Sequence, residues 1–429
     1  MRRRLLTLAA GLGLLGLACP APPVPCTPCV TCDDELDRPD AENLKAPSTA
    51  IVPHDLEKIF GTPTLASEMM GNPFVYFRKI NTETIPLTCA AFEDALRWFP
   101  PFDLHGDAHL EQFAVSAEYH GLSDYDDVAT GPGVIDLVRF GVSVRIAARM
   151  KGWQDQVPRV IEAFLDRYTE TLAADVPPDD AVPSVVPRLR ENIAADRKSW
   201  LKWVSGVTSD VSDEVRAELE PGAAAYRKLM QWRHPDLPPT FFDTKKIGHL
   251  QLGVGSRLHP KFLFRVEGLS PDPNDDVVIE FKPVTRSTNN GCVSYGGATS
   301  IVRTIRLFAN EPVRFIAQVP YVAGEPLGEM PYWAREWLES YAELRVDELE
   351  SVDELGEVVL DVATELATVH PRLHGEDTQA RREQVALCGV LRPRIIATID
   401  DIAERTWQGW EAFAAEAERR GLSPRAPRK

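Results

Sequence analysis

Residues 103–113 read DLHGDAHLEQF and place two histidines and three acidic residues within one short stretch. Prolines precede the stretch at positions 100 and 101, and Gly106 predicts a turn in its middle. The apolar run over residues 113–116 predicts a strand, so the acidic residues lie in a loop beside a strand. Neighbouring carboxylates repel one another unless a metal ion or a hydrogen-bond donor neutralises them, and the stretch therefore predicts a site that holds a cation.

A second acidic cluster follows at residues 123–127, SDYDD, and the segment GPGVIDL over residues 131–137 comes after it. Apolar residues recur at helical spacing over residues 137–148, which predicts a buried helix that Asp136 opens and caps. The other helices expected in this half of the chain span residues 89–98, 157–173 and, with loops, 182–243.

The composition is that of a globular protein with two lobes or domains. The chain has 429 residues, of which 44% are hydrophobic and 26% charged, so it can bury a sizeable core. The formal net charge of -17 argues against a nucleic-acid partner, because binding a polyanion requires a concentrated basic surface and the sequence contains no such block. The oligomeric state does not follow from these features.

The N-terminus has the pattern of an export signal. Residues 1–4, MRRR, are basic, and residues 5–18 are apolar or small except for Thr7, in a run too short to span a bilayer comfortably. The pattern resembles a bacterial lipoprotein signal with Cys19 directly after the cleavage site, which implies lipidation of that cysteine. We expect an exported protein, in the periplasm or anchored to a membrane by its lipid alone. Simple secretion after an ordinary signal cleavage is the alternative.

Residues 19–49 are expected to form a tether. Five prolines between residues 20 and 28 favour extended backbone, and residues 33–40 are acidic and poor in apolar side chains. The pattern C-x-x-C-x-x-C begins at Cys26. A metal site there would need a fourth ligand and a folded frame, so disulfides or free thiols are the expected state, and an oxidising compartment would allow cysteines to pair.

From His249 onward the pattern changes to strands. Residues 262–266, FLFRV, and 277–282, VVIEFK, flank a turn-forming segment and predict a β-hairpin or meander. A glycine-containing turn, LGVGSR, precedes the hairpin at residues 252–257, and Lys282 ends its second strand. Backbone N–H groups of a glycine loop and a lysine on a neighbouring strand together can clamp a phosphate.

The remainder is expected to be mostly amphipathic helix. The helices predicted here span residues 333–349, 352–370 and 384–420, with a frayed basic tail over residues 419–429.

These motifs resemble the bacterial family catalogued as domain of unknown function 2252. The specific part of the resemblance is the motif HGDAHLEQF at residues 105–113, followed by residues 124–127, Gly131-Pro132 and residues 136–139. Looser matches are residues 71–78 (GNPFVYFR), the Gly253–Ser256 segment, the Lys282 strand and residues 366–370 (LATVH). That family is grouped with the protein-kinase-like superfamily. The resemblance, which covers residues from about 50 to about 375, implies an α+β, two-lobed, protein-kinase-like fold with permuted motif order, because the acidic loops precede the glycine loop.

In aminoglycoside-phosphotransferase-like kinases an aspartate orients the acceptor hydroxyl, an amide and a second aspartate hold Mg²⁺, and a third aspartate anchors the loop. Phosphoryl transfer needs these groups because charge develops on the phosphoryl oxygens. The resemblance implies that Asp107 is the catalytic base, that Asp124, Gln112 and Asp126 bind Mg²⁺, and that His105, Asp136 and Arg139 support the loop. It further implies that Gly253, Gly255, Ser256 and Lys282 bind the phosphates of ATP or another phosphorylated ligand.

Two features depart from this pattern. Gln112 stands where the family and kinases have asparagine, and its oxygen is displaced by about one methylene, which an octahedral Mg²⁺ site tolerates poorly. An exported protein also meets little ATP. The expected function is a phosphotransferase-like protein that binds a nucleotide or a phosphorylated small molecule with Mg²⁺. A catalytically inactive kinase-like binding module at the cell envelope is the alternative.

A third interpretation does not depend on the family. His105, Asp107 and His109 alternate, so on a strand they would share one face and could bind Zn²⁺ or another transition metal. Asp124 or Asp126 would complete a metal-dependent hydrolase site.

Each of several residues is also compatible with a simpler, structural role. His109 alone is compatible with an ordinary hydrogen-bonding role in a loop, and Asp126 and Asp127 with solvated turn acids. Lys282 is compatible with an ordinary charge on an edge strand, with Glu280 on the same face as its partner.

The expected organisation is a signal peptide (1–18), a tether (19–49), a helical lobe with both acidic loops (50–243), a β-rich lobe with the glycine loop and the lysine strand (244–325), and C-terminal helices (326–429).

Overall fold

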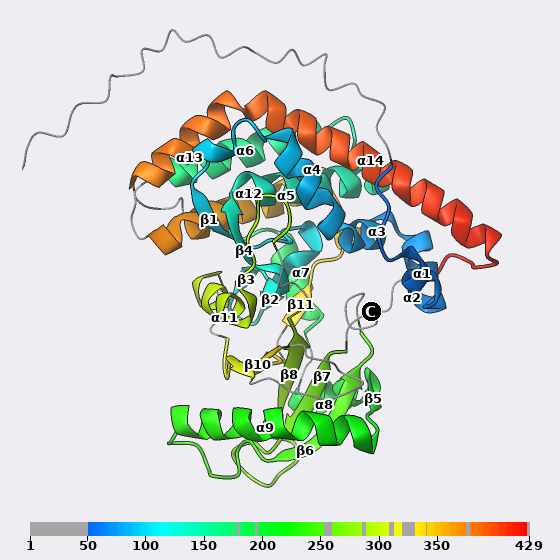
Figure 1. Ribbon diagram of the computed structural model, residues 1–429, viewed down its shortest axis with the longest axis vertical. Coiled ribbons are helices and arrows are strands. Elements are labelled where there is room, and N and C mark those ends of the chain that lie inside the picture. Colours follow the sequence, from blue (N-terminus) through cyan, green and yellow to red (C-terminus); the bar gives the residue numbers. More distant parts are fainter. Residues whose placement is uncertain are drawn as a thin grey trace, which may run out of the picture. The chain divides into compact units, whose positions relative to one another are not determined.

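The buried helix α5 (Val134–Lys151) is the central element of the helical part of the protein, as seen in a computed structural model (Figure 1). Most of its residues are buried, and apolar side chains occur on all of its faces, which is the pattern of a helix enclosed by others. Helices α3, α4, α6, α12 and α14 pack around it. The prediction of a buried helix after the second acidic cluster is therefore confirmed.

The structure describes residues 50–174, 176, 178, 181–193, 196–252, 260–284, 289–308, 313–319, 331–339, 341–374 and 378–426. The expected signal peptide and tether, with Cys19, lie outside these residues, and so do Gly253, Gly255 and Ser256. The described residues all fall within one unit of the chain, Pro47–Lys429.

Helices make up most of the described chain. Besides α5 they are α1 (Leu56–Phe60), α2 (Pro63–Gly71), α3 (Pro73–Lys79), α4 (Asn81–Ala91), α6 (Val157–Ala173), α7 (Val185–Glu191), α8 (Arg197–Gly206), α9 (Asp213–Arg233), α11 (Gly297–Phe308), α12 (Val352–Val369), α13 (Thr378–Val390) and α14 (Arg392–Arg419). Short 3-10 helices are η2 (Leu96–Trp98), η3 (Leu110–Gln112), η4 (Tyr125–Asp127), η5 (Val346–Glu348) and η6 (His370–His374). In the part of the chain that the structure covers, no helix is both long and apolar enough to cross a bilayer.

The strands of the described residues form three sheets. They are β1 (Pro101–Leu104), β2 (Phe113–Ser116), β3 (His120–Leu122), β4 (Ala129–Pro132), β5 (Thr208–Asp210), β6 (Thr244–Leu250), β7 (Phe262–Val266), β8 (Val277–Pro283), β9 (Ala317–Val319), β10 (Tyr332–Glu336) and β11 (Tyr341–Glu343). Their orders are β1-β4, β11-β2-β3 and β5-β6-β7-β8-β10-β9. The mixture of helices and sheets confirms the α+β prediction.

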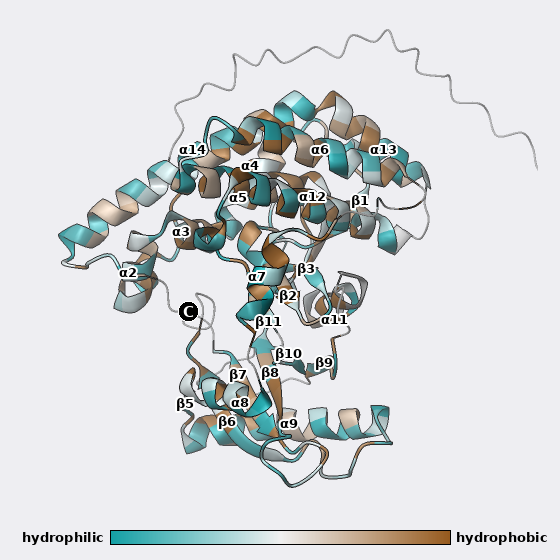
Figure 2. Ribbon diagram, turned by 180° about the vertical axis from the view of Figure 1, so that it is seen from behind, coloured by the Kyte–Doolittle hydropathy of each residue, from teal (hydrophilic) through white to brown (hydrophobic). Residues whose placement is uncertain are grey.

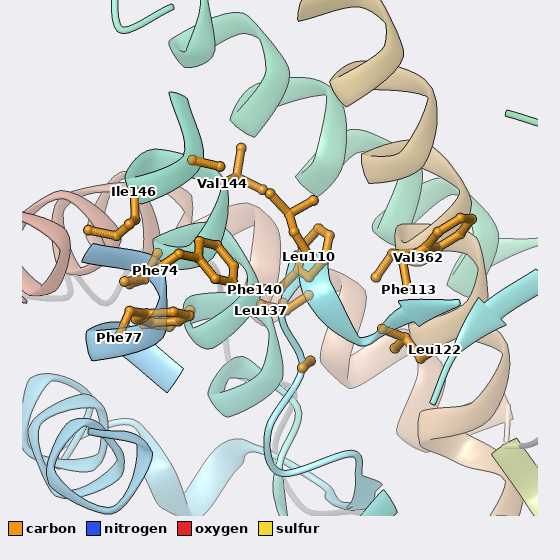
Figure 3. Close-up of a cluster of buried hydrophobic side chains, with 14 of the residues drawn as sticks. Phe74, Phe77, Leu110, Phe113, Leu122, Leu137, Phe140, Val144, Ile146 and Val362 are labelled. Atoms are coloured by element: carbon orange, nitrogen blue, oxygen red, sulfur yellow. The ribbon is translucent and has the colours of Figure 1, made fainter. Parts of the chain in front are cut away.

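A cluster of apolar side chains lies directly beside the first acidic loop (Figure 3). Phe74 and Phe77 from α3, Leu110 from η3, and Phe140 from α5 meet in it, and Phe113 at the start of β2 packs further along. These side chains fix the chain on the C-terminal side of the loop, because their burial is lost if residues 110–113 move.

Helices cover both faces of the six-stranded sheet, and β7 shows why. Phe262, Phe264 and Val266 pack in the cluster with α9, whereas Leu263 packs in the cluster with α8. Successive side chains of a strand point to opposite faces, so a strand covered on both sides is mostly apolar, and β7 has one charged residue, Arg265. Figure 2 shows hydrophilic and hydrophobic residues along α9 and α14, as expected for helices with one face in water.

The predicted helix over residues 157–173 and the hairpin of residues 262–266 with 277–282 are confirmed by α6, β7 and β8. The helix predicted over residues 333–349 is wrong, because this segment forms β10, β11 and η5. Its alanine, arginine, glutamate and leucine residues favour helix locally, but pairing of β10 with β8 and β9 overrides that preference. The sheet therefore takes strands from outside residues 244–325.

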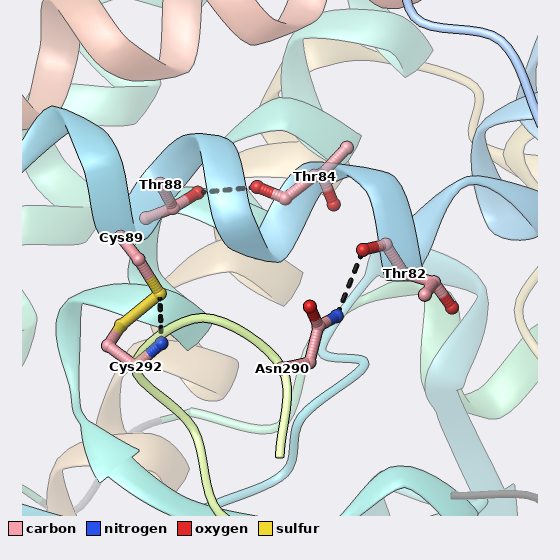
Figure 4. The surroundings of a disulfide bond; sticks show 6 residues. All are labelled: Thr82, Thr84, Thr88, Cys89, Asn290 and Cys292. Atoms are coloured by element: carbon pink, nitrogen blue, oxygen red, sulfur yellow. Dashed lines mark hydrogen bonds between the residues drawn. A yellow bond between two sulfur atoms is a disulfide. The ribbon is translucent and has the colours of Figure 1, made fainter. Parts of the chain in front are cut away.

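The helix predicted over residues 89–98 is also misplaced, because α4 begins at Asn81 and contains Pro86. Proline lacks the N–H that would bond the carbonyl four residues earlier, which is that of Thr82. That carbonyl instead accepts a hydrogen bond from the side-chain amide of Asn290, at 3.0 Å (Figure 4). A distant segment thus compensates for the proline.

A disulfide bond joins the same two segments. Cys89 at the end of α4 is bonded to Cys292, across a sequence separation of 203 residues (Figure 4). Thr130 of β4 and Ser294 exchange two backbone hydrogen bonds of 2.8 Å close by. The connection that follows β8 is therefore attached to the helical part both covalently and by hydrogen bonds.

Replacing both Cys89 and Cys292 by serine is expected to lower the free energy of unfolding by about 2–5 kcal/mol, because the bond closes a long loop in the unfolded chain. Urea unfolding without reductant measures the difference. Reduction of the wild-type protein is expected to give the same loss, and the double variant is expected to lose nothing further on reduction. Equal stability of both proteins without reductant would contradict the pairing.

Candidate functional site

The side-chain carboxylate of Asp136 holds the His-Gly-Asp turn by binding backbone N–H groups of the turn. The N–H of His105 donates to Oδ2 of Asp136 at 2.7 Å, and the N–H of Gly106 donates to Oδ1 at 2.9 Å. The carboxylate lies in the first turn of α5, where the helix dipole stabilises negative charge. The expectation that Asp136 caps its own helix is wrong, since no side chain caps α5 and Gly133 is the N-cap residue.

Two further buried side chains support Asp136 from behind. Nε2 of His370 lies 3.1 Å from Oδ2 of Asp136, and the hydroxyl of Tyr168 lies 2.7 Å from Nδ1 of His370. All three residues are 0% exposed. Sequence reasoning did not assign a role to His370 or Tyr168, although His370 ends the LATVH motif; Tyr168 looked like an ordinary core residue of α6.

Gly106 allows the two acidic loops to touch. Its φ of +78° lies in the left-handed region, and a Cβ at this position would lie 1.9 Å from the backbone oxygen of Asp127. Both features exclude a larger residue. The turn of the first loop therefore packs directly on the backbone of the second.

Asp107, the predicted base, is fixed by Arg139. The guanidinium donates to Oδ1 of Asp107 from Nη2 at 2.8 Å and from Nε at 3.1 Å. It also lies over the ring of Phe77, at 3.7 Å from the ring centroid. One carboxylate oxygen of Asp107 thus has a defined position before any ligand binds.

The two histidines of the first loop have different surroundings. Nε2 of His105 lies 2.8 Å from the backbone oxygen of Ser123, and burial lowers the pKa of His105 although Asp136 opposes this. The ring of His109 packs edge-on against Phe74 and Phe77. Among the described residues no group of three or more His, Cys, Asp or Glu side chains is placed to hold a metal ion. The metal-dependent hydrolase stays an untested prediction.

Lys282 on β8 meets the second acidic loop. Its ammonium lies 2.5 Å from Oδ1 of Asp124 and 3.0 Å from Oδ1 of Asp126. Asp124 has a φ of 56°, a left-handed conformation that is uncommon for a residue other than glycine. The structure thus brings the expected phosphate-binding lysine together with two of the expected metal ligands.

The charges in this contact stabilise one another. Burial would lower the pKa of the Lys282 ammonium, but Asp124, Asp126 and Glu280 together raise it. Burial would likewise raise the pKa of Asp124, but Lys282 and Lys261 hold it well below its usual range. Both groups therefore stay ionised, which a buried pair requires if it is to be stable.

Two more cations complete the cluster, and sequence reasoning did not single them out. Lys261 lies 3.2 Å from Asp126, and Arg335 on β10 lies 3.4 Å from Glu280 on β8, its partner in the strand register. Glu280 is itself 4.0 Å from Lys282. Because β8 lies between β7 and β10, Lys282 is not the edge-strand charge considered as an alternative.

The remaining predicted ligand, Gln112, is buried at the end of η3. Its backbone oxygen accepts a hydrogen bond from the hydroxyl of Ser123 at 2.8 Å, which joins it to the residue before Asp124. Of the expected metal ligands, Asp124 and Asp126 therefore contact the same cation, the ammonium of Lys282. Gln112 is instead linked to Ser123 through its backbone oxygen.

A polar cluster from two other elements lies next to both loops. Arg78 at the end of α3 pairs with Glu111 at 3.2 Å. The hydroxyl of Tyr341 on β11 lies 2.8 Å from the hydroxyl of Ser123 and 3.1 Å from a carboxylate oxygen of Glu343. Burial by the surrounding protein raises the pKa of Glu343. Arg78 belongs to the GNPFVYFR motif, but the residues on β11 had no recognisable signal.

A cavity lies elsewhere in the protein. It measures about 600 Å³ and is lined by Arg233, His234, Arg314 and Phe315 among others, between the end of α9 and the segment before β9. None of the predicted site residues lines it. We place the candidate site at the two acidic loops, which lie against each other at Gly106 and Asp127, and where Lys282 contacts Asp124.

Residues 62–241 match the family described as "Uncharacterized protein conserved in bacteria (DUF2252)". This match supports the family that the motifs resemble. It contains both acidic loops and Arg139, and it ends before Lys282. No curated protein and no solved structure matches the chain.

The strand that leads into Asp124 depends on a buried carboxyl group. Oε2 of Glu365, on α12, accepts the N–H of Leu122 at 2.7 Å, and burial raises the pKa of Glu365 to about 8. The pKa of this carboxyl group is higher in the folded than in the unfolded state. Its contribution to the free energy of unfolding is therefore fully present below the unfolded pKa of about 4.3. That stability is lost as the pH rises towards 8.

The Glu365→Gln variant is expected to lose this part of the pH dependence, because glutamine accepts the same hydrogen bond without ionising. Between pH 5 and pH 8 the free energy of unfolding of the wild-type protein should fall by up to about 1.4 kcal/mol per pH unit because of this group. Thermal unfolding at pH 5.5 and pH 8.0 measures it, with Glu357→Gln, an exposed site on the same helix, as the control. An equal pH dependence in wild type and Glu365→Gln would refute the assignment.

Proposed function

We propose that this chain is an exported, kinase-like protein that binds a nucleotide or another phosphorylated ligand together with Mg²⁺, and that it transfers a phosphoryl group. The observation that carries the proposal is the contact of the Lys282 ammonium with Asp124 and Asp126, beside the loop of Asp107. Phosphoryl transfer requires a carboxylate near the acceptor, acids for the metal, and a lysine for the phosphates. The four residues supply each of these groups.

The residues present fit a magnesium ion. Mg²⁺ in phosphate-handling sites binds through one or two carboxylates together with waters and substrate phosphates. Asp124 and Asp126 offer two hard oxygen ligands that already share one cation, and both side chains keep contact with solvent. Mg²⁺, when bound, would neutralise charge on the phosphates. Gln112 would contribute at most a weaker ligand.

The fold is compatible with a permuted kinase-like arrangement. Strands β6 and β7 pair on either side of the glycine-containing segment, β8 carries Lys282, and α11 follows β8. Both acidic loops precede the six-stranded sheet in the chain. We take the two-lobed kinase-like fold as part of the proposal.

One observation favours an inactive binding module instead. In kinases the phosphate-binding lysine pairs with a glutamate of the helix that follows, whereas α11 reads GATSIVRTIRLF and contains no acidic residue. Lys282 pairs with the expected metal ligands themselves. Binding and turnover therefore have to be measured separately.

Export is supported by the Cys89–Cys292 bond, because structural disulfides persist mainly in oxidising compartments. The basic and apolar N-terminus and Cys19 add the lipoprotein interpretation. A phosphorylated ligand other than ATP fits this location, since ATP is scarce outside the cytoplasm.

ATP with Mg²⁺ is expected to raise the melting temperature of the purified protein by a few degrees at saturating ligand, since binding to the folded state alone stabilises it. Asp124→Asn and Lys282→Met should abolish the shift. Asp107→Asn should keep the shift in melting temperature, but its rate of ADP release should fall about 100-fold or more. Other phosphorylated compounds are screened in the same way.

A shift without ADP release in the wild type would establish the binding module. Neither shift nor release with any phosphorylated ligand would refute the proposal. Lys246→Met, an exposed position on β6, is the matched control for Lys282→Met.

Lys282→Met is also expected to bind Mn²⁺ more tightly than the wild type when no nucleotide is present. The ammonium competes with a metal ion for Asp124 and Asp126, and removing it should increase the affinity about tenfold or more. Calorimetric titration with Mn²⁺ measures this, again with Lys246→Met as the control. Unchanged or weaker binding would show that the two carboxylates do not form the metal site.

A further inference from the structure

His109 is buried completely beside the proposed base. It is 0% exposed, and neither of its ring nitrogens has a hydrogen-bond partner among the residues that the structure describes. Its Nε2 lies 3.7 Å from Oδ2 of Asp107, just beyond hydrogen-bond distance. Buried polar groups are nearly always hydrogen-bonded in folded proteins, so this arrangement requires an explanation.

Aromatic packing fixes the ring. Phe74 and Phe77 meet it edge-on, at centroid distances of 5.8 and 6.2 Å. Arg139 lies over the ring of Phe77 and holds Oδ1 of Asp107. The carboxylate of Asp107 therefore has Arg139 at one oxygen and His109 near the other.

The imidazole is neutral near pH 7. Burial is the largest cause that lowers the pKa of His109, and the nearby Arg78, Arg139 and His105 lower it further, against the opposing effect of Asp124. In a neutral imidazole one nitrogen carries a hydrogen and the other a lone pair.

The separation indicates which nitrogen carries the hydrogen. An Nε2–H group that faced the ionised Asp107 would form a charge-assisted hydrogen bond of about 2.7–2.9 Å. A lone pair on Nε2 is repelled by the carboxylate instead, which agrees with the observed 3.7 Å. The separation therefore favours the tautomer with its hydrogen on Nδ1.

We propose that His109 is a positioning residue, which accepts a hydrogen bond from Asp107 once Asp107 has taken the proton of the acceptor hydroxyl. This inference rests on the proposed phosphoryl transfer. The hydroxyl proton moves to Oδ2 of Asp107, and the hydroxyl oxygen forms the new bond to phosphorus. The bond from phosphorus to the leaving oxygen breaks, and its electron pair stays on the leaving group. His109 gains no proton.

The contact between His109 and Asp107 becomes stabilising only as Asp107 is protonated. In the resting state the Nε2 lone pair and the carboxylate have no attraction. As the proton arrives, the repulsion is lost and the two atoms can approach from 3.7 Å, so that the new O–H of Asp107 can donate to Nε2. An interaction that strengthens towards the transition state raises kcat without tightening substrate binding.

Nitrogen-15 NMR of histidine-labelled protein measures the tautomer directly. We expect the His109 signals near pH 7 to show an unprotonated Nε2 and a protonated Nδ1, and Asp107→Asn to shift the Nε2 signal. The signal is assigned by its loss in His109→Phe. A protonated Nε2 would overturn the inference.

Turnover with ATP and Mg²⁺ tests the catalytic part. His109→Phe keeps an aromatic ring in the same packing but removes both nitrogens, and it is expected to lower kcat about 10- to 100-fold with an unchanged KM for ATP. His109→Gln, whose amide reaches the Nε2 position, should recover part of the loss. His120→Phe, on the partly exposed strand β3, is the control and should have no effect.

An equal kcat in wild type and His109→Phe would contradict the inference. The two proposals fail in distinguishable ways. A wild-type protein that does not turn over removes the phosphotransferase proposal, and the role of His109 with it. An active wild-type protein with a protonated Nε2 removes the role of His109 alone.

Discussion

The ammonium of Lys282 lies almost entirely inside the protein, and a cation there is stable only where carboxylates replace the water that it has lost. Asp124 and Asp126 supply them from a loop 158 residues away in the sequence. Removing either side of this contact would leave an uncompensated charge, so β8 and the second acidic loop have to meet. The position of the sheet next to the acidic loops follows from that requirement.

The turn of the first acidic loop is held through its backbone. Asp136 binds two of its backbone N–H groups, and His370 supports Asp136 from a helix that comes much later in the chain. Gly106 lets this loop lie on the backbone of the second. Asp107 and Asp124, which keep contact with solvent, are thus presented by a frame of buried groups.

Features with a local pattern were predictable from the sequence, and those that depend on distant pairing were not. The period of apolar residues located α6. The sequence motifs singled out Asp124 and Lys282, whose side chains are in contact in the structure. The segment 333–349 was mistaken for a helix because its side chains favour one, whereas its structure is decided by the neighbouring strand β8. Arg335 lies on this segment, so its place beside Glu280 was hidden by the same error. No sequence pattern could show that Glu365 and His370 support the two loops, because this depends on how α12 packs.

The Cys89–Cys292 bond closes a covalent ring that contains all of the acidic residues assigned to the site, together with Lys282. A protease that cuts the chain once anywhere between these cysteines would produce two fragments that remain joined. The Asp107 loop and the lysine strand would therefore not separate on a non-reducing gel or during purification. A single backbone cut would then be compatible with an intact site.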